Sequence, residues 1–191
     1  MRQHWRIATI VVVLVLFGCW KLLGVGYNVG YSPQQPLPFS HKLHAGINHI
    51  PCQYCHAGVD RSRLSIMPPL NVCMGCHAVV DSNAPPIRKL KAAYEANKPI
   101  QWVRVYDLPE FVYFQHRWHI AAGIACQTCH GPVQDMDQVK QQYQWTMGEC
   151  LNCHRNDNLL HEPGDSGYHR DPATFHNRKA NAQQDCDVCH N

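Results

Sequence analysis

The chain has 191 residues and a formal net charge of +3, and it has no run of Lys or Arg of the kind that indicates nucleic-acid binding. Its composition includes 11 cysteines and 14 histidines. About 150 residues follow an apolar N-terminal segment, and these residues hold all but one of the cysteines. A basic nucleic-acid-binding protein is therefore excluded, and the cysteines are where the chemistry of the chain is to be sought.

Residues 1–30 predict a cytoplasmic tip and a single transmembrane helix. Residues 7–27 are apolar or small apart from Lys21, which is about the 20 residues needed to cross a bilayer if the Lys21 amine reaches the interface. Arg2 and Arg6 precede this segment and place the N-terminus in the cytoplasm. We expect the remainder of the chain on the periplasmic face of a bacterial inner membrane.

Two alternatives remain open for this segment. A cleaved signal peptide has the same charged start and short apolar region. Cys19, which follows Leu16-Phe17-Gly18, loosely resembles the modified cysteine of a lipoprotein. We favour a retained anchor, followed by a semi-rigid linker with three prolines at residues 31–38.

An internal repeat follows the linker. Phe39-x-His41-x-x-His44 and Phe114-x-His116-x-x-His119 have the same pattern, and a Cys-x-x-Cys-His motif begins eight and seven residues after them, respectively. In both copies a second such motif comes about 20 residues later. The repeat predicts two modules, at residues 39–100 and 101–156, and residues 157–191 add a further motif.

Cys-x-x-Cys-His occurs five times, and each occurrence is typical of a covalent haem attachment site. The two thiols form thioethers with the porphyrin, and the histidine is the proximal iron ligand. Zinc knuckles and disulfides are the competing interpretations, but neither needs a histidine directly after the second cysteine. The five motifs, numbered 1 to 5 in chain order, are Cys52/Cys55/His56, Cys73/Cys76/His77, Cys126/Cys129/His130, Cys150/Cys153/His154 and Cys186/Cys189/His190.

The expected fold is mostly α-helix and coil around five haem c groups. Roughly 30 residues per motif are too few for a conventional core, so the cofactors would form much of the interior. Between the modules, residues 86–94 predict a helix with proline at its start, and residues 101–106 alternate like a strand. Residues 161–184 are expected to be mostly loop.

Six-coordinate irons need second axial ligands, and histidines three apart lie on one helical face. The matching frames ahead of the haem motifs identify four distal ligands, namely His41, His44, His116 and His119. For the fifth iron we favour Met136, ahead of Met147. Other candidates are Met67, His49, His161, His169 and His176.

The first frame and its following motif, residues 39–56, resemble the start of the cytochrome c3 and c7 families. This resemblance implies c3/c7-like modules in which the first histidine of a pair serves the next haem and the second crosses to another. His41 would then pair with the haem of His56, and His116 with that of His130. His44 and His119 would cross to other haems.

A longer pattern is similar to the pentahaem, membrane-anchored subunit of bacterial alternative complex III. It comprises residues 104–114, residues 126–133 and Met147-Gly148-Glu149 followed by motif 4. Members often have Trp where this chain has Glu149. The resemblance implies a quinol-oxidising membrane complex whose partners are a molybdopterin-enzyme-like iron–sulfur subunit and polytopic membrane subunits. A mono-haem cytochrome, another periplasmic acceptor or an oxidase would receive the electrons.

These patterns predict an electron-transfer subunit without a catalytic site of its own. Haem propionates and ferric irons would bring the net charge to roughly −2. A multihaem reductase would keep one iron open for substrate, and no Cys-x-x-Cys-Lys motif indicates such a site. A stand-alone quinol dehydrogenase with one anchor is the other alternative, and a zinc-binding scaffold is a third.

Overall fold

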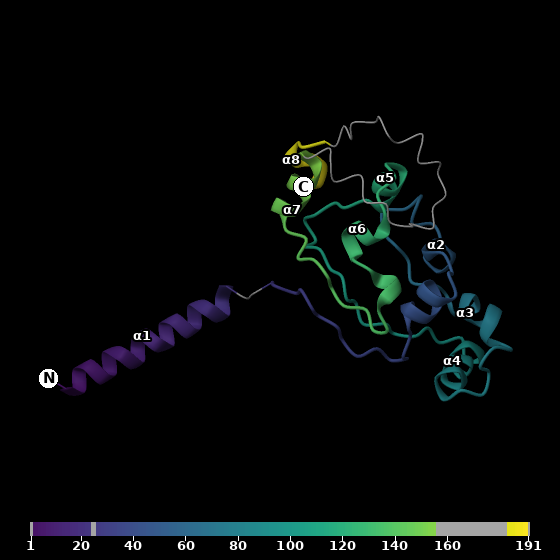
Figure 1. The fold of residues 1–191 in the computed structure, drawn as a ribbon, viewed down its shortest axis with the longest axis horizontal. Coiled ribbons are helices and arrows are strands. Elements are labelled where there is room, and N and C mark those ends of the chain that lie inside the picture. Colours follow the sequence, from purple (N-terminus) through teal and green to yellow (C-terminus); the bar gives the residue numbers. More distant parts are fainter. Residues whose placement is uncertain (1, 24–25, 156–182, 191) are drawn as a thin grey trace.

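The structure is a computed structural model, and it describes residues 2–23, 26–155 and 183–190. Short helices joined by long coil segments make up this part of the chain, and no β-strand occurs in it (Figure 1). The mostly α and coil fold is therefore confirmed. The helices are α1 (Arg2–Leu23), the π-helical turn η1 (Lys42–Ile47), α2 (Cys52–Cys55), α3 (Leu70–His77), α4 (Pro85–Glu95), α5 (His116–Ala121), α6 (Cys126–His130), the 3-10 turn η2 (Val133–Asp135), α7 (Met147–Arg155) and α8 (Cys186–Cys189).

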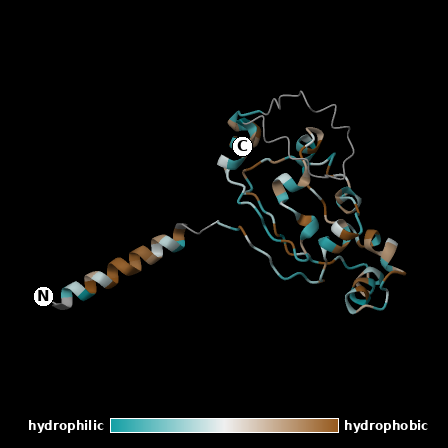
Figure 2. Cartoon of the chain, in the orientation of Figure 1, coloured by the Kyte–Doolittle hydropathy of each residue, from teal (hydrophilic) through white to brown (hydrophobic). Residues whose placement is uncertain are grey.

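The N-terminal helix α1 is long and apolar. Its stretch His4–Leu22 has a mean hydropathy of 1.8 and is long enough to cross a membrane. In Figures 1 and 2, α1 extends away from the other helices as a predominantly hydrophobic rod. The expected apolar helix is confirmed, but it begins earlier than residue 7 and ends at Leu23 rather than Tyr27.

The polypeptide core is small. Among the described residues, the buried hydrophobic side chains are those of Leu37, Val59, Leu90 and Met136. Large apolar side chains such as Val79 and Trp118 remain 80% and 61% exposed, respectively. Chains of this length normally bury a much larger apolar interior. The coil is therefore arranged around space that the polypeptide itself does not fill.

Helix α4 connects the two repeats. Pro85 and Pro86 occupy its first turn, where a missing N–H costs nothing, and Asn97 ends the helical path with a φ of 51°. The helix predicted at residues 86–94 is confirmed. The strand predicted at residues 101–106 is wrong, because the backbone of Val103 pairs with the side-chain amide of Gln35 and not with another strand; both hydrogen bonds are 2.9 Å.

The proline-containing linker lies along the second repeat. The backbone N–H of Gly30 donates to the Gln141 carbonyl at 2.8 Å, and that of Gln141 donates to the Tyr31 carbonyl at 2.9 Å. The hydroxyl of Ser32 donates to Val139 O at 3.0 Å. Residues 30–32 are therefore fixed to the module that begins 70 residues later in the chain.

The two repeats also interlock at Gly46. A Cβ atom at this position of η1 would collide with the backbone oxygen of Gln134 in η2. The backbone N–H of Lys42 adds a hydrogen bond of 3.0 Å to the Met136 carbonyl. Glycine is required here because the two turns approach each other through their backbones.

Candidate functional site

The first histidine frame is held by an aromatic clamp. The ring of Phe39 stacks on His44 at 4.4 Å and 25°, and it meets His41 edge-on at 4.8 Å and 85°. The Nδ1–H of His44 donates to the Ser40 carbonyl at 2.8 Å. One phenylalanine therefore fixes the planes of both imidazoles.

The second frame has the same geometry. Phe114 stacks on His119 at 4.4 Å and 30°, and it meets His116 edge-on at 4.9 Å and 89°. The Nδ1–H of His119 donates to the Gln115 carbonyl at 2.9 Å. The sequence repeat is therefore also a structural one, although the first frame continues into a π-helical turn and the second into an α-helix.

Three of these frame histidines face the histidine of a Cys-x-x-Cys-His motif. Two imidazoles that bind one metal ion through Nε2 at about 2 Å each have ring centroids about 6 Å apart. The observed separations have this value. The pairs are His44 and His77 at 6.0 Å, His116 and His130 at 6.3 Å, and His119 and His154 at 6.1 Å.

The motif histidines are oriented by backbone carbonyls. A carbonyl only accepts hydrogen bonds, so a histidine that contacts one through Nδ1 carries its proton there and leaves the Nε2 lone pair free for a metal. This arrangement recurs in motifs 1, 2 and 4. The contacts are His56 to Ile66 O at 3.1 Å, His77 to Val80 O at 3.1 Å and His154 to Gln183 O at 2.7 Å.

Burial keeps several of these imidazoles neutral. Burial, with smaller contributions from the nearby His116 and His56, lowers the pKa of His130 to about 4. Burial also lowers the pKa of His41 to about 4, with smaller effects from His56 and His44. Only the neutral imidazole binds a metal ion, so the side chains are in the binding form at neutral pH.

No disulfide joins any of the 11 cysteines, all of which lie in the described residues. Helices α2, α6 and α8 each begin at the first cysteine of a motif, which places the paired thiols about one helical turn apart. In the described part of the chain, no three Cys, His, Asp or Glu side chains converge as a closed zinc site requires. The donor set therefore fits haem attachment better than zinc knuckles or disulfides.

The motif cysteines differ in exposure, although the five motifs are equivalent in sequence. Cys76, Cys150 and Cys186 are exposed, whereas the other seven motif cysteines are partly buried. Cys76 is the second cysteine of motif 2 and lies in the last turn of α3, one helical turn after Cys73. The polypeptide alone therefore does not enclose Cys76. Haem attachment at Cys76 stays a prediction.

The thiols also reveal the order of the motifs in space. Cys126 of motif 3 is hydrogen-bonded to Cys52 of motif 1, which together with burial raises the pKa of Cys126. Burial raises the pKa of Cys55 in motif 1, and the nearby Cys73 and Cys76 of motif 2 are among the groups that raise it further. Motif 1 therefore lies between motifs 2 and 3.

Motif 4 continues the series. Burial raises the pKa of Cys129 to about 11, with Cys153 and Cys150 of motif 4 as further causes. The pKa of Cys150 is raised in turn by burial and then by Cys189 of motif 5. The spatial order of the motifs is 2, 1, 3, 4, 5, which is not their order in the sequence.

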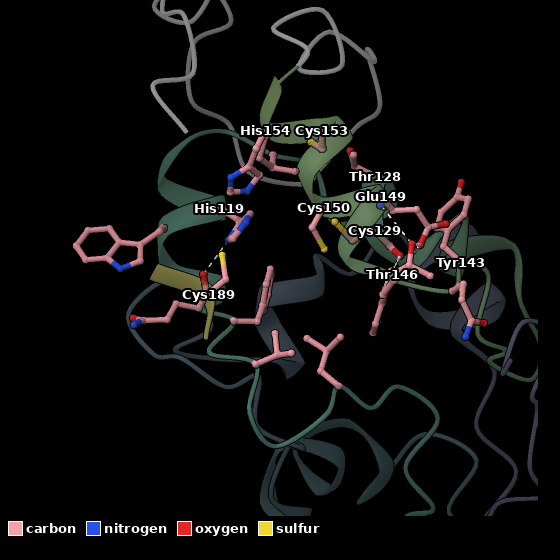
Figure 3. Close-up of a pocket in the computed structure, with 18 of the residues that line it drawn as sticks. His119, Thr128, Cys129, Tyr143, Thr146, Glu149, Cys150, Cys153, His154 and Cys189 are labelled. Carbon is pink, nitrogen blue, oxygen red and sulfur yellow. Dashed lines mark hydrogen bonds between the residues drawn. The ribbon is translucent and has the colours of Figure 1, made fainter. Parts of the chain in front are cut away.

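A cavity of about 2540 Å³ connects motifs 3, 4 and 5. Small-molecule pockets usually have about 300–1,000 Å³, so this space is large enough for more than one bulky group. Figure 3 shows Cys129 of motif 3 and Cys150 and Cys153 of motif 4 around the hollow, with the rings of His119 and His154 close to each other at its edge. Labelled lining residues are His119, Cys129, Cys150, Cys153, His154 and Cys189.

Comparison with known proteins agrees with this geometry. Residues 118–191 match the cytochrome c3 family. This part of the chain, a little over a third of its length, is therefore similar to cytochrome c3 domains. Such domains carry covalently attached haem c and transfer electrons. A distant relative is the "Menaquinone reductase, multiheme cytochrome c subunit" of Nitratidesulfovibrio vulgaris (strain Hildenborough), which is 27% identical over 170 residues, 78% of this chain and 80% of that protein.

The histidine of motif 3, His130, packs against two aromatic side chains. The ring of Tyr106 meets His130 edge-on at 4.6 Å and stacks on Trp145 at 5.0 Å. The Tyr106 hydroxyl donates to the carbonyls of Lys140 and His130 at 3.0 and 3.3 Å. The indole N–H of Trp145 donates to Cys129 O at 2.9 Å. Burial raises the pKa of Tyr106 to about 12, so its hydroxyl remains a donor.

Motif 5 is held by backbone pairing. The Tyr113 N–H donates to the Cys189 carbonyl at 2.8 Å, and Val112 forms an isolated antiparallel bridge with His190. The ring of Phe111 stacks on His190 at 5.8 Å and 28°. Residues 111–113 thus fix the last haem attachment site against the start of the second module.

The candidates for the fifth distal ligand lie in different environments in the structure. Met136 is 8% exposed and ends η2, where its carbonyl accepts from Lys42. Met147 and His49 line the large cavity, and Met67 is exposed on the surface. Three further candidates, His161, His169 and His176, lie outside the described residues, as does most of the loop predicted at residues 161–184. The ligation by Met136 stays a prediction.

Sequence analysis missed the groups that orient the axial histidines. Most are backbone carbonyls, such as those of Arg63, Ile66 and Val80, and any residue type supplies a carbonyl. A signal was present for Glu149, which departs from the related pattern. Its carboxylate accepts from the N–H of Thr146 at 2.7 Å, and its own N–H donates to Thr146 Oγ1 at 3.3 Å. This reciprocal pair is a capping box at the start of α7, and Thr-x-x-Glu is its sequence signature.

Proposed function

We propose that this chain is a pentahaem cytochrome c subunit that carries electrons within a membrane-bound quinol-oxidising complex of the alternative complex III type. The observation that carries the proposal is the set of three imidazole pairs at 6.0–6.3 Å, each joining a frame histidine to a haem motif. Each such pair would supply two imidazole nitrogens to one haem iron, which suits electron transfer rather than substrate binding at motifs 2, 3 and 4.

The residues of the chain hold the proposed cofactors rigidly. Haem iron, when bound, supplies reversible one-electron chemistry. The thiols of each motif would form the thioethers, the motif histidine would be the proximal ligand, and His44, His116 and His119 would be distal ligands to motifs 2, 3 and 4. His41, whose pKa is lowered by the nearby His56, would serve motif 1.

The contiguous motif order supports a relay. Thiols of successive motifs in the series 2, 1, 3, 4, 5 are close enough to perturb one another's pKa values. Electrons would enter at one end of this series and leave at the other. The partners we propose are an iron–sulfur subunit related to molybdopterin enzymes, polytopic membrane subunits, and a periplasmic cytochrome or oxidase as acceptor.

Helix α1 is the proposed membrane anchor. The stretch His4–Leu22 has the length and hydropathy of a span. Arg2 and Arg6, at the N-terminal end of α1, favour a cytoplasmic N-terminus, which would put the haem domain on the periplasmic side. The distant relative is named as a subunit of a menaquinone reductase, which supports association with a quinone-reactive membrane complex.

The name of that relative also favours a second candidate function. A menaquinone reductase passes electrons to the quinone, which is opposite to quinol oxidation. The same haem series would serve either direction, because the direction depends on the potentials at its two ends. A stand-alone quinol dehydrogenase without partner subunits remains the third alternative.

Three measurements test these proposals, and the first two use the chain purified from membranes. Intact mass of the denatured chain is expected to show five covalent haems, and the oxidised protein is expected to be entirely low-spin. The bare polypeptide mass would contradict haem attachment, and one high-spin haem in five would favour a reductase. Rapid mixing of the co-purified complex with a menaquinol analogue then decides the direction: haem reduction by quinol in the complex supports our proposal, and haem oxidation by menaquinone supports the second candidate.

Co-purification decides between a complex and a stand-alone enzyme. We expect the affinity-purified chain to bring an iron–sulfur subunit and polytopic membrane proteins with it. A chain that is isolated alone and is still reduced by quinol would contradict the proposed complex.

A further inference from the structure

One exposed loop, residues 62–66, contacts axial histidines of two different motifs. The Nδ1–H of His56, in motif 1, donates to Ile66 O at 3.1 Å and lies 3.3 Å from Ser65 Oγ. The Nδ1–H of His116, the partner of motif 3, donates to Arg63 O at 2.9 Å. The loop therefore orients one imidazole on each of two neighbouring sites.

Few contacts hold this loop in shape. All five of its residues are exposed, so no buried side chain fixes it. Locally, the Ser62 N–H donates to Gly58 O at 2.9 Å, and the N–H of Leu64 lies 3.3 Å from Ser62 Oγ. Towards the second module, the backbone N–H groups of His116 and Arg117 donate to Arg63 O and Ser62 O, both at 3.2 Å.

The side chain of Arg63 is the additional anchor. Its Nη2 donates to the Val112 carbonyl at 3.3 Å, and its guanidinium lies 4.6 Å from the centre of the Tyr113 ring. Residues 112 and 113 are themselves paired with motif 5 through backbone groups. Arg63 thus fastens the loop to a segment that is already fixed.

We propose that Arg63 is a positioning residue that sets the orientation and basicity of the axial ligands His56 and His116. This inference rests on the proposed haem binding. A carbonyl that accepts from Nδ1–H makes the imidazole more electron-rich and favours the ferric iron. Loosening the loop weakens both hydrogen bonds at once and raises both midpoint potentials.

The proposal predicts an unusual pattern, in which one surface side chain changes two haems and leaves three unchanged. At motif 3 the sensitive quantity is the angle between the imidazole planes of His116 and His130, which are nearly parallel, at 7°. The g-values of a low-spin ferric haem depend on the angle between its two imidazole planes. Rotation of His116 is therefore visible by electron paramagnetic resonance.

The experiment uses the full-length protein with its haems attached and four variants. Arg63→Ala removes the anchor, and Arg63→Lys keeps a cation and a donor. Ser65→Ala removes only the hydroxyl near His56. Arg61→Ala is the matched control, because the Arg61 side chain is 87% exposed and contacts Asp60 at 3.5 Å. Haem content by mass comes first, and redox-titrated resonance spectra follow.

We expect Arg63→Ala to shift two of the five signals and to raise their midpoint potentials. Arg63→Lys should restore both towards wild type. Ser65→Ala should move one of the same two signals, which identifies motif 1, and Arg61→Ala should move none. Spectra of Arg63→Ala that match Arg61→Ala would overturn the proposal, and so would equal changes in all five signals.

Two outcomes separate this inference from the proposed function. Wild-type protein without covalent haem would end the proposed function itself. Wild-type protein with haem and insensitive Arg63 variants would end only the role of Arg63. If Arg63→Ala does not acquire its haems, Tyr113→Leu removes the ring beneath the guanidinium instead. Tyr113→Leu must then shift the same two signals, and unchanged signals would overturn the inference.

Discussion

At the scale of single residues, the frame histidines differ from ordinary surface histidines in having both ring position and proton position fixed. Phe114 fixes the plane of His119, the Gln115 carbonyl holds its Nδ1 proton, and His154 faces it at 6.1 Å. Burial also lowers the pKa of His119. Each of these contacts prepares Nε2 for a metal.

Replacing His119 by Ala is therefore expected to open one iron. The haem of motif 4 should become high-spin and bind carbon monoxide, and the other haems should remain low-spin. Optical and resonance spectra of the oxidised and carbon-monoxide-treated protein measure this change. Trp118→Ala on the same helix is the control, because its side chain is 61% exposed and should leave all haems low-spin. A fully low-spin His119→Ala protein would rule out His119 as a ligand.

Tyr106→Phe tests the aromatic support of motif 3. The hydroxyl donates to two carbonyls, so its loss should reduce the free energy of unfolding by about 1–2 kcal/mol at neutral pH. Because burial raises the folded pKa of Tyr106 from 10 to about 12, the folded state retains the proton that the unfolded state releases. This contribution is fully present below about pH 10 and is lost as the pH rises towards 12.

Denaturant titrations of wild type and Tyr106→Phe at about pH 8 and about pH 11 measure that difference. The difference in the free energy of unfolding between wild type and Tyr106→Phe should be smaller at the higher pH. An equal difference in the free energy of unfolding at both pH values would show that the hydroxyl proton does not contribute. Tyr143→Phe is the control, because Tyr143 is 41% exposed and its hydroxyl should contribute little to stability.

At the scale of elements, the close approach of η1 and η2 depends on a missing side chain. Gly46→Ala places a methyl group against the Gln134 backbone oxygen. We expect a loss of about 1–3 kcal/mol of stability, because a backbone atom must move to relieve the collision. The change also displaces η1, which contains His44, so the haem of motif 2 should show altered g-values.

Gly148→Ala is the matched control for this prediction. A Cβ there meets only Thr146 Oγ1 at an ordinary 3.7 Å, and Ala favours the helix more than Gly. Denaturation midpoints of the two variants should therefore move in opposite directions, or Gly148→Ala should stay at the wild-type value. Equal stability of Gly46→Ala and wild type would contradict the close approach.

The elements also show which features were predictable. Proline at the start of α4 and the apolar run of α1 act locally, so sequence analysis identified both helices. Residues 101–106 have the alternation of a strand, but a strand needs a partner, and the local pattern could not reveal that the Gln35 amide takes this role. The π-helical turn η1 was also unpredictable, because its frame resembles that of α5 in sequence.

The candidate site was likewise predictable only where the sequence carries a local signal. The motif cysteines and histidines follow from spacing, and the frame histidines follow from the repeat. The structure brings His44 to His77, His116 to His130 and His119 to His154. Their ligation stays a prediction until a haem-loaded structure is available. Carbonyl acceptors, the exposure of individual thiols and the spatial order of the motifs depend on tertiary structure and leave no residue-specific signal.

At the scale of the whole molecule, the chain that follows α1 contacts the second module from residue 26 onward. The Asn28 N–H donates to Gln144 Oε1 at 3.0 Å, and the side-chain amide of Gln144 donates to Gly26 O. From there the chain follows the second module. Residues 26–32 thus contact the second module, and the linker boundaries at residues 31–38 stay a prediction.

Replacing residues 1–25 by a cleavable secretion signal should therefore release an intact haem domain. We expect a water-soluble protein whose visible spectrum equals that of the full chain, because the contacts of residues 26–32 are retained. Fractionation of cells that lack the partner subunits measures the distribution. The full chain should stay in the membrane fraction after a high-salt wash, and a truncated chain that also stays there would contradict anchoring by α1.

The linear order of the motifs determines what the loss of a single haem would do. If electrons pass through the haems in series, loss of any one haem stops electron transfer. In a branched network the same loss would only lower the rate. Motif 3 stands in the middle, and its histidine is the one held by Tyr106 and Trp145. Loss of this central motif would therefore separate the two ends of the series, and the rings of Tyr106 and Trp145 pack against its histidine.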